Sequence, residues 1–378
     1  MKKKKNEYKP HRHKDLPKKI LSAAATLLLA YVFAVLGYSV AKPFGEVGET
    51  EISEISGLEL LKASPEGAEH EREKEDSIKA YMLAEEEFED IDELSSEIQL
   101  VNKHNFDTIV VPLKIEGGML NYSSAYEGAV MADVGNDIEL SDILSVIEQE
   151  GFKPAAAINT MEDNLYPKSN NEAGFNLSSG QKLWYDKQSS DGKPWLDPAS
   201  TETKKYLSSI TSEIAKAGFE YILCTDMKYP PFSAEALEDI GGKTASPDRY
   251  LDLIDDVDAM SAAASDKGSM FWLEISADEL FDGKSEVFRK PIMLNVQKYV
   301  LQIDPQLFTG YKTINGKETD FSGLGFEDKI KKVCGAIEGM IYKTSYIPEV
   351  LTDSLSEEEK GKIKDIFSEM GYESYIVK

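Results

Sequence analysis

From Ser77 onward the chain alternates short apolar runs with longer amphipathic stretches, and this alternation limits the folds available to it. The apolar runs predict strands at residues 77–83, 106–115, 152–159, 221–224, 269–276, 298–304 and 372–378. The stretches between them predict helices at residues 91–105, 137–151, 201–218, 248–268, 326–343 and 354–371. An eighth strand, expected near residues 339–342, has no distinct apolar run. Strands that alternate with helices of this length pair in parallel.

About 300 residues of this alternation favour an α/β fold in which eight parallel strands close into a TIM-like (β/α)8 barrel. An open doubly wound sheet is the competing arrangement. No GxGxxG motif follows the first strand, so nothing supports a dinucleotide-binding fold or a nucleotide cofactor. We therefore predict one barrel domain over residues 77–378.

The first 41 residues predict a membrane anchor. Residues 1–19 contain nine Lys/Arg and two Asp/Glu, and the segment from Ile20 to Ala41 has no charged residue. A helix of this length would span about 33 Å, enough for a bilayer core. The positive-inside rule keeps the basic head in the cytoplasm and places the barrel outside the cell. A signal peptide cleaved near Ser39 or Ala41 is the alternative.

Charge separates the remaining chain from the basic head. The net charge is −26 overall and +7 in residues 1–19, which leaves −33 on the rest. Such an acidic chain does not suit nucleic-acid binding, which requires clustered Lys and Arg. Residues 42–76 are acidic and poor in aromatic residues, which predicts a solvated linker between membrane and barrel.

Cysteines and histidines give no indication of a metal site. Cys224 and Cys334 are the only cysteines, and CxxC and HExxH motifs are absent. An exported protein could join the two cysteines. Cys224 lies in an apolar strand, however, which favours two unpaired cysteines in the core.

Two carboxylates stand where a barrel carries its reactive groups, at the carboxyl ends of strands. Asp226 follows the fourth strand and Glu274 ends the fifth. Glycoside hydrolysis uses such a pair, about 5–5.5 Å apart in retaining enzymes and about 6.5–9.5 Å apart in inverting ones. Strands lie about 4.8 Å apart, so the two could flank one site. The alternatives are a polar strand end for Asp226 and a solvated or salt-bridged side chain for Glu274.

Other residues near the predicted mouth are candidates for substrate contact. Aromatic rings suit sugar faces. The aromatic candidates are Trp184, Tyr185, Trp195, Tyr229, Phe232 and Trp272. Loop packing or core packing is the alternative for them, and it is the better interpretation for Trp272. The polar candidates are Lys228, Asp163, Asp278 and Asp304, with Glu116 as a weaker one.

The segment WLDPASTETKKYLSSITSEIAKAGFEYILCTDMKYP, residues 195–230, resembles a bacterial family of glycoside hydrolase-like domains. The family pattern there is roughly W-V-N-P, a helix, and G-F-D-E-I-Q-F-D-Y-I-R-F-P. Weaker similarity covers most of residues 77–378, including NFDTIVVPLKIEGGMLNY (105–122) and ISADELFDG (275–283). The resemblance implies a (β/α)8 barrel distantly similar to α-amylase-type enzymes. It also implies a nucleophile and an acid on the two strands that carry Asp226 and Glu274.

Several positions depart from the family pattern. Aligning Lys228-Tyr229-Pro230 with R-F-P puts Thr225, and not Asp226, at the presumed catalytic aspartate. Other family polar positions are also replaced, at Pro112, Ile115, Ala157 and Glu162. Side chains alternate faces along a strand, so a shift of one residue could turn Asp226 away from the site. A bulge or an irregular backbone at the strand end could restore it.

These observations predict a membrane-anchored, extracytoplasmic barrel that acts on or binds polysaccharide of the cell surface or the environment. In one hypothesis the domain is a glycosidase that uses Asp226 and Glu274. In the second it is a catalytically degenerate barrel that binds carbohydrate or organises the cell envelope. A protein-interaction scaffold is a third possibility.

Overall fold

The computed structural model describes residues 77–378, except for residues 87, 89, 102, 181, 188–190, 283–293, 295, 315, 340–345 and 353–354. The predicted basic head, membrane segment and acidic linker therefore lie outside the described residues. Among the helices that are described, none is both long enough and apolar enough to cross a bilayer.

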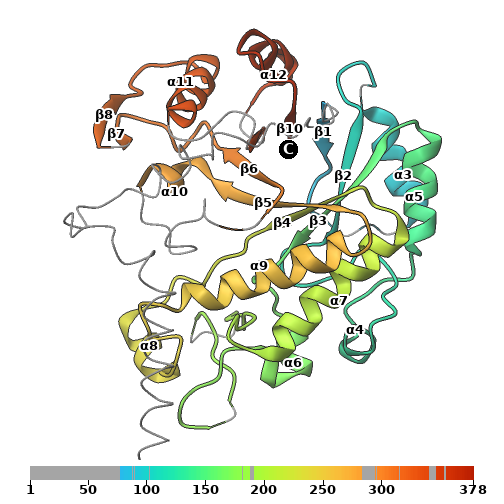
Figure 1. The fold of residues 1–378 in the computed structure, drawn as a ribbon, viewed down its shortest axis with the longest axis vertical. Helices are drawn as coiled ribbons and strands as arrows, with labels where there is room; N and C mark the ends of the chain where they lie inside the picture. The colour runs from blue at the N-terminus through green and yellow to red at the C-terminus, as the bar shows by residue number, and fades with distance from the viewer. Residues whose placement is uncertain are drawn as a thin grey trace, which may run out of the picture. The chain divides into compact units, whose positions relative to one another are not determined.

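Eight parallel strands close into a barrel in the order β1-β2-β3-β4-β5-β6-β9-β10 (Figure 1). The strands are β1 (Lys79–Met82), β2 (Thr108–Lys114), β3 (Lys153–Asn159), β4 (Tyr221–Thr225), β5 (Met270–Ser276), β6 (Lys298–Ile303), β9 (Tyr346–Val350) and β10 (Tyr375–Val377). The ring closes where β10 pairs with β1, with Ile376 opposite Ala80. The predicted α/β barrel is confirmed.

Helices connect the strands on the outside of the barrel. The longer ones are α3 (Ile91–Leu100), α5 (Leu140–Gln149), α7 (Thr201–Ala217), α9 (Tyr250–Ser265), α11 (Phe326–Glu338) and α12 (Glu357–Glu369). The shorter ones are α4 (Glu127–Ala132), α6 (Tyr166–Ser169), the 3₁₀ turn η1 (Asn171–Ala173), α8 (Ala234–Ile240) and α10 (Ala277–Asp282). An antiparallel hairpin of β7 (Tyr311–Ile314) and β8 (Lys317–Asp320) is inserted between β6 and α11.

Helix α7 shows how the sequence sets these boundaries. The Ser200 side chain accepts hydrogen bonds from the backbone N–H groups of Glu202 and Thr203, which satisfies donors that the first turn leaves free. Gly218 ends the helix with φ of +122°, a conformation that glycine adopts without a Cβ clash. The buried side chains recur every three or four residues, at Thr203, Tyr206, Leu207, Ile210, Thr211 and Ile214.

The eighth strand lies further along the chain than predicted. Residues 339–342 were expected to form it, but the strand is β9, Tyr346–Val350. Its sequence, YIPEV, contains Pro348, which lacks the N–H that a ladder uses, and Glu349, which interrupts the apolar run. All five residues are nevertheless buried. An apolar-run criterion cannot identify such a strand.

The barrel interior is filled by side chains from all eight strands. They are Ile78, Ala80, Met82, Val110, Ala155, Ala157, Tyr221, Leu223, Trp272, Val300, Ile347 and Ile376. Trp272 is fully buried and stacks on Tyr221, with ring centroids 4.6 Å apart. Its interpretation as a core residue is confirmed. Cys224 and Cys334 are both buried and no disulfide joins them to each other, which agrees with the prediction of two core cysteines.

Candidate functional site

A layer of polar side chains lies above the apolar interior at the carboxyl ends of the strands. Side chains alternate faces along a strand, so a residue two positions beyond an inward-facing one also faces inward. Two positions beyond the last inward-facing apolar residue, six strands carry a polar residue that should also face inward. These residues are Asn159, Thr225, Glu274, Gln302, Glu349 and Lys378. The carboxyl end is also where barrel enzymes carry their active sites.

Asp226 enters this polar layer because the backbone leaves strand geometry at that residue. Thr225 ends β4 facing inward, so regular alternation would point Asp226 away. Asp226 instead has φ of +51°, in the left-handed region, which Asp tolerates better than most residues. Asp226 and Glu274 both line a pocket of about 80 Å³. The structure thus brings the two predicted catalytic residues to one pocket.

Two nitrogen donors hold the Asp226 carboxylate. Lys228 forms an ion pair with Oδ1, and Asn159 donates a hydrogen bond from Nδ2 to Oδ2 at 3.0 Å. The same Asn159 nitrogen lies 3.0 Å from Glu85 Oε1. Burial lowers the pKa of Lys228, but the neighbouring Asp226 outweighs burial and leaves that pKa raised. Lys228, which was predicted as a site residue, lines the same pocket as Asp226. Its ammonium group is the cation that pairs with Asp226 there.

Glu274 meets a second carboxyl group inside the barrel. Burial raises the pKa of Glu274 well above its usual range, and the adjacent Glu349 raises it further. Within the described part of the chain, no donor reaches Glu274 Oε2 or either oxygen of Glu349. Two carboxyl groups in contact are stable only when a proton lies between them. Burial and the neighbouring Glu349 therefore favour the protonated form of Glu274 over its ionised form.

Lys378 limits the negative charge of this layer. Burial lowers its pKa, but Glu274, Glu349 and Glu85 outweigh burial and leave that pKa raised. Its Nζ lies 3.7 Å from Glu85 Oε2. Lys378 and Lys228 are thus two cations among the acids of the mouth. The sequence analysis missed Glu349, Lys378 and Glu85, and the inward register of β9 and β10 would have identified the first two.

Glu162 is a further acid that the sequence analysis treated only as a departure from the family pattern. Burial and the neighbouring Glu116 raise the pKa of Glu162 to about 7. Lys228 and Asp226 also act on it electrostatically, which places Glu162 near the pocket. Glu116, the weaker candidate, pairs with Lys193 across 3.4 Å at the surface.

Three of the aromatic rings predicted to contact substrate are largely covered. Trp184, Trp195 and Tyr229 are only 8%, 4% and 4% exposed. The Tyr229 hydroxyl donates to the backbone oxygen of Arg249 at 2.6 Å, and the Arg249 guanidinium lies over its ring. These rings pack within the loops that follow β3 and β4. Trp184 also lines the pocket beside α8, so its predicted substrate contact stays a prediction.

Asp163 has a structural position instead of the predicted substrate contact. Its Oδ2 lies 3.1 Å from Lys114 Nζ, and both side chains are fully buried. Its Oδ1 accepts hydrogen bonds from the backbone N–H groups of Leu165 and Tyr166. Lys114 also donates to the backbone oxygen of Asn159 at 2.8 Å. This buried pair fastens the loop after β3 to the end of β2.

Asp278 and Asp304 lie outside the pocket that Asp226 and Glu274 line. Asp278, in α10, pairs with Lys312 of the β7 strand. Asp304 follows β6 and accepts a hydrogen bond from the backbone N–H of Gln306 at 2.8 Å. Across the described ranges, no group of three or more His, Cys, Asp or Glu residues has metal-binding geometry.

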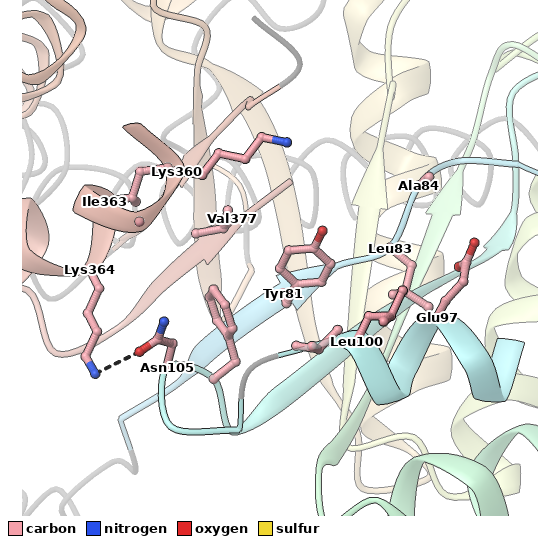
Figure 2. Close-up of a pocket in the computed structure, with 13 residues that line it drawn as sticks. Tyr81, Leu83, Ala84, Glu97, Leu100, Asn105, Lys360, Ile363, Lys364 and Val377 are labelled. Atoms are coloured by element: carbon pink, nitrogen blue, oxygen red, sulfur yellow. Dashed lines mark hydrogen bonds between the residues drawn. The ribbon is translucent and has the colours of Figure 1, made fainter. Parts of the chain in front are cut away.

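Figure 2 shows a larger groove, of about 480 Å³, lined by α3, α12 and the strand β1. Lys364 donates to Asn105 Oδ1 across it at 3.1 Å. Glu97 is the one carboxylate in its lining. The groove therefore lacks the pair of acids that glycoside hydrolysis needs. A third pocket, of about 640 Å³, lies between the loop that carries Tyr185 and α8.

Comparisons with known proteins found one family model and several solved structures that are similar to this chain. Residues 80–264 match the family model described as "Putative glycosyl hydrolase domain". No curated protein matches the chain. Similar solved structures include the PgaB (BpsB) glycoside hydrolase domain from Bordetella bronchiseptica, at 14% identity, 80% coverage of this chain, 93% of that chain and a TM-score of 0.48.

Two other solved structures are similar. The glycoside hydrolase domain of PelA from Pseudomonas aeruginosa has 11% identity, 80% and 94% coverage of the two chains, and a TM-score of 0.38. A hypothetical protein from Ruminiclostridium thermocellum ATCC 27405 has 16% identity, 51% and 96% coverage, and a TM-score of 0.42. Matches this distant carry no weight for activity. The family match does, and it confirms that residues 80–264, from β1 to α9, resemble the "Putative glycosyl hydrolase domain" family.

Proposed function

We propose that this barrel is a glycoside hydrolase in which Asp226 and Glu274 perform the chemistry. The observation that carries the proposal is that both carboxyl groups line one pocket at the carboxyl end of the barrel. Residues 80–264, which include Asp226, match a glycosyl hydrolase family. Glu274 lies beyond that match, so its assignment depends on the geometry alone.

The surroundings of the two carboxyl groups support different roles. Asp226 is held by the Lys228 ammonium group and the Asn159 amide N–H, which orient its carboxylate in the pocket. Glu274 keeps its proton because it is buried beside Glu349. Two carboxyl groups with separated protonation states are what glycoside hydrolysis requires.

In the proposed reaction, Glu274 donates its proton to the glycosidic oxygen as the bond from that oxygen to the anomeric carbon breaks. Asp226 either attacks the anomeric carbon or removes a proton from the attacking water. The first course retains the configuration at that carbon, and the second inverts it. In the retaining course, water then displaces Asp226 from the anomeric carbon while Glu274 takes a proton from that water, which regenerates both side chains.

We further propose that the domain works outside the cell, anchored to the membrane by residues 20–41. The support is the uncharged 22-residue segment between a basic head and an acidic body. The substrate would then be polysaccharide of the cell surface or the environment. Protease treatment of intact cells tests this topology: removal of the barrel supports it, and full protection contradicts it.

A degenerate barrel that binds carbohydrate without cleaving it is the second candidate. The observation that favours it is the small pocket, about 80 Å³, in which Lys228 already neutralises Asp226. Binding sites for small molecules usually measure about 300–1,000 Å³. The pocket thus has room for the reacting group but not for a sugar ring without some opening.

Screening the full 378-residue chain against aryl glycosides and purified wall glycans separates the two candidates. Turnover that disappears in Asp226→Asn supports the hydrolase. The matched control is Asp304→Asn, because Asp304 only accepts a bond from its own turn. Retention of a glycan without any turnover supports the binding barrel and refutes the hydrolase.

A further inference from the structure

The mouth pocket is too small to bind a polymer, so recognition of a polysaccharide requires more surface nearby. A pocket of about 640 Å³ lies between the loop after β3 and helix α8. This volume is within the range of small-molecule sites, about 300–1,000 Å³. We call it the Tyr185 pocket, and its lining includes Tyr185, Asp186, Pro231, Glu235 and Asp239.

Backbone hydrogen bonds hold the walls of the Tyr185 pocket in place. The loop folds on itself as Trp184 N–H donates to Phe175 O at 2.8 Å and Leu177 N–H donates to Lys182 O at 2.9 Å. Ser178 N–H then donates to Asp239 O at 2.8 Å, which ties the loop to α8. A site with fixed walls loses little conformational entropy on binding.

The lining has the chemistry of a sugar site. Tyr185 is 39% exposed, and its flat ring can cover the C–H face of a pyranose. Next to Tyr185 in the sequence, Trp184 packs against Phe175 and Phe232. These contacts fix the backbone that carries Tyr185. Carboxylates of the lining can accept hydrogen bonds from sugar hydroxyls.

The Tyr185 pocket lies close to the proposed catalytic pocket. Lys228 lines the mouth pocket, and Pro231 lines the Tyr185 pocket. Pro231 is three positions beyond Lys228, so their Cα atoms are at most about 11 Å apart. The residues between them include Tyr229 and Pro230, and Tyr229 is fixed by its bond to Arg249. One short oligosaccharide could therefore occupy both pockets.

Charge narrows the class of polysaccharide. Three carboxylates line the Tyr185 pocket, Asp186, Glu235 and Asp239, against two ammonium groups, Lys182 and Lys187. The whole chain carries a net charge of −26. An anionic polymer would be repelled at long range by such a domain. An uncharged or cationic glycan would not be.

We propose that the Tyr185 pocket binds an uncharged or cationic polysaccharide beside the bond that is cleaved at Asp226 and Glu274. This inference rests on the proposed function for its substrate. The pocket contributes affinity for long chains, while the mouth pocket contributes the chemistry. A short aryl glycoside fills only the mouth pocket and gains nothing from Tyr185.

The test compares KM for a polysaccharide with KM for a short aryl glycoside, using the full chain. In Tyr185→Ala the KM for the polysaccharide should rise at least about fivefold more than the KM for the aryl glycoside. This is the effect expected from the loss of one aromatic contact. Tyr185→Phe keeps the ring and should restore the affinity. Tyr311→Ala is the matched control, because Tyr311 is exposed on the β7–β8 hairpin and is not among the residues that line either pocket. Equal effects on both substrates overturn the proposal.

Failure of the proposed function gives a different result. If the wild-type chain turns over neither substrate, co-sedimentation with insoluble polysaccharide tests the pocket separately. If the wild-type chain binds the polysaccharide and Tyr185→Ala binds it at least about fivefold less, the result supports the pocket. Equal binding by both chains, or no binding by the wild-type chain, overturns the proposal. Comparing a neutral glucan, chitosan and polygalacturonate tests the charge argument. Preference for polygalacturonate, the anionic polymer, contradicts it.

Discussion

Glu274 and Glu349 face each other inside the barrel although their strands are not neighbours. Strand β6 pairs with β5 on one side and with β9 on the other, so the two acids meet across it. Burial raises the pKa of Glu274 well above its usual range, and Glu349 raises it further. Burial and Glu349 together therefore favour the protonated form of Glu274.

Replacing Glu349 by Gln should move the alkaline limb of activity to lower pH. In the proposed reaction the active form of Glu274 is protonated, so activity should fall as pH rises through the pKa of Glu274. Removing the charge of Glu349 lowers that pKa, so Glu274 loses its proton at a lower pH. The measurement is kcat/KM against pH, with Glu318→Gln on the exposed hairpin as control. An unchanged limb, or a shift to higher pH, contradicts the assigned contact.

Asp256 should make the fold less stable as pH rises. It is fully buried in α9, neither of its carboxyl oxygens has a donor among the described residues, and burial raises its pKa to about 8. The folded state thus holds a proton that the unfolded chain releases near pH 4. Stability is greatest at low pH and falls by about 2–3 kcal/mol between pH 6 and pH 8.

Asp256→Asn removes this titration. The variant should show a flatter dependence of the unfolding free energy on pH and should exceed the wild type in stability above pH 8. Urea unfolding at several pH values measures it. Asp255→Asn is the neighbouring control, because the Asp255 side chain is 65% exposed. Parallel pH curves for the wild type and Asp256→Asn would show that Asp256 does not titrate in this range.

The buried pair of Lys114 and Asp163 should matter for stability. Lys114→Met leaves the Asp163 carboxylate buried beside an apolar side chain and should lower the unfolding free energy by about 3–5 kcal/mol. Adding Asp163→Asn to Lys114→Met removes the unpaired charge and should restore part of the loss. A double variant as unstable as Lys114→Met alone would mean that charge is not the cause.

Two glycines offer a matched test of how tightly Asp163 is enclosed. Gly118 has φ of +102°, and a Cβ there would lie 2.1 Å from Asp163 Oδ1. Gly151 has φ of +79°, and a Cβ there would meet nothing within 4 Å. Gly118→Ala should therefore destabilise the fold by more than Gly151→Ala, whose cost is about 1–2 kcal/mol of backbone strain. Thermal unfolding of both variants checks the order, and equal losses would contradict the enclosure.

Periodicity predicted most of the barrel because its strands and helices are long and continuous. Seven of its strands and its six longer helices lie where the apolar runs and the amphipathic stretches indicated. β9 was misplaced because Pro348 and Glu349 interrupt its apolar pattern. The hairpin and the short helices of four to seven residues are too brief to show a period.

The site was only partly predictable for a different reason. Strand ends identify residues such as Asp226 and Glu274, but the φ of +51° that directs Asp226 is a property of the folded loop. Burial of Asp163 and of Trp195 depends on contacts with distant segments, and composition does not reveal them. Glu349 was missed together with its strand.

The most direct test compares leaving groups in Glu274→Gln and Asp226→Asn. If Glu274 is the acid, Glu274→Gln should lose about 10²–10⁴-fold in kcat/KM on native glycans but far less on aryl glycosides whose leaving group needs no proton. Asp226→Asn should lose activity on both kinds of substrate. Equal losses of Glu274→Gln on both substrates, or an active Asp226→Asn, would contradict the account.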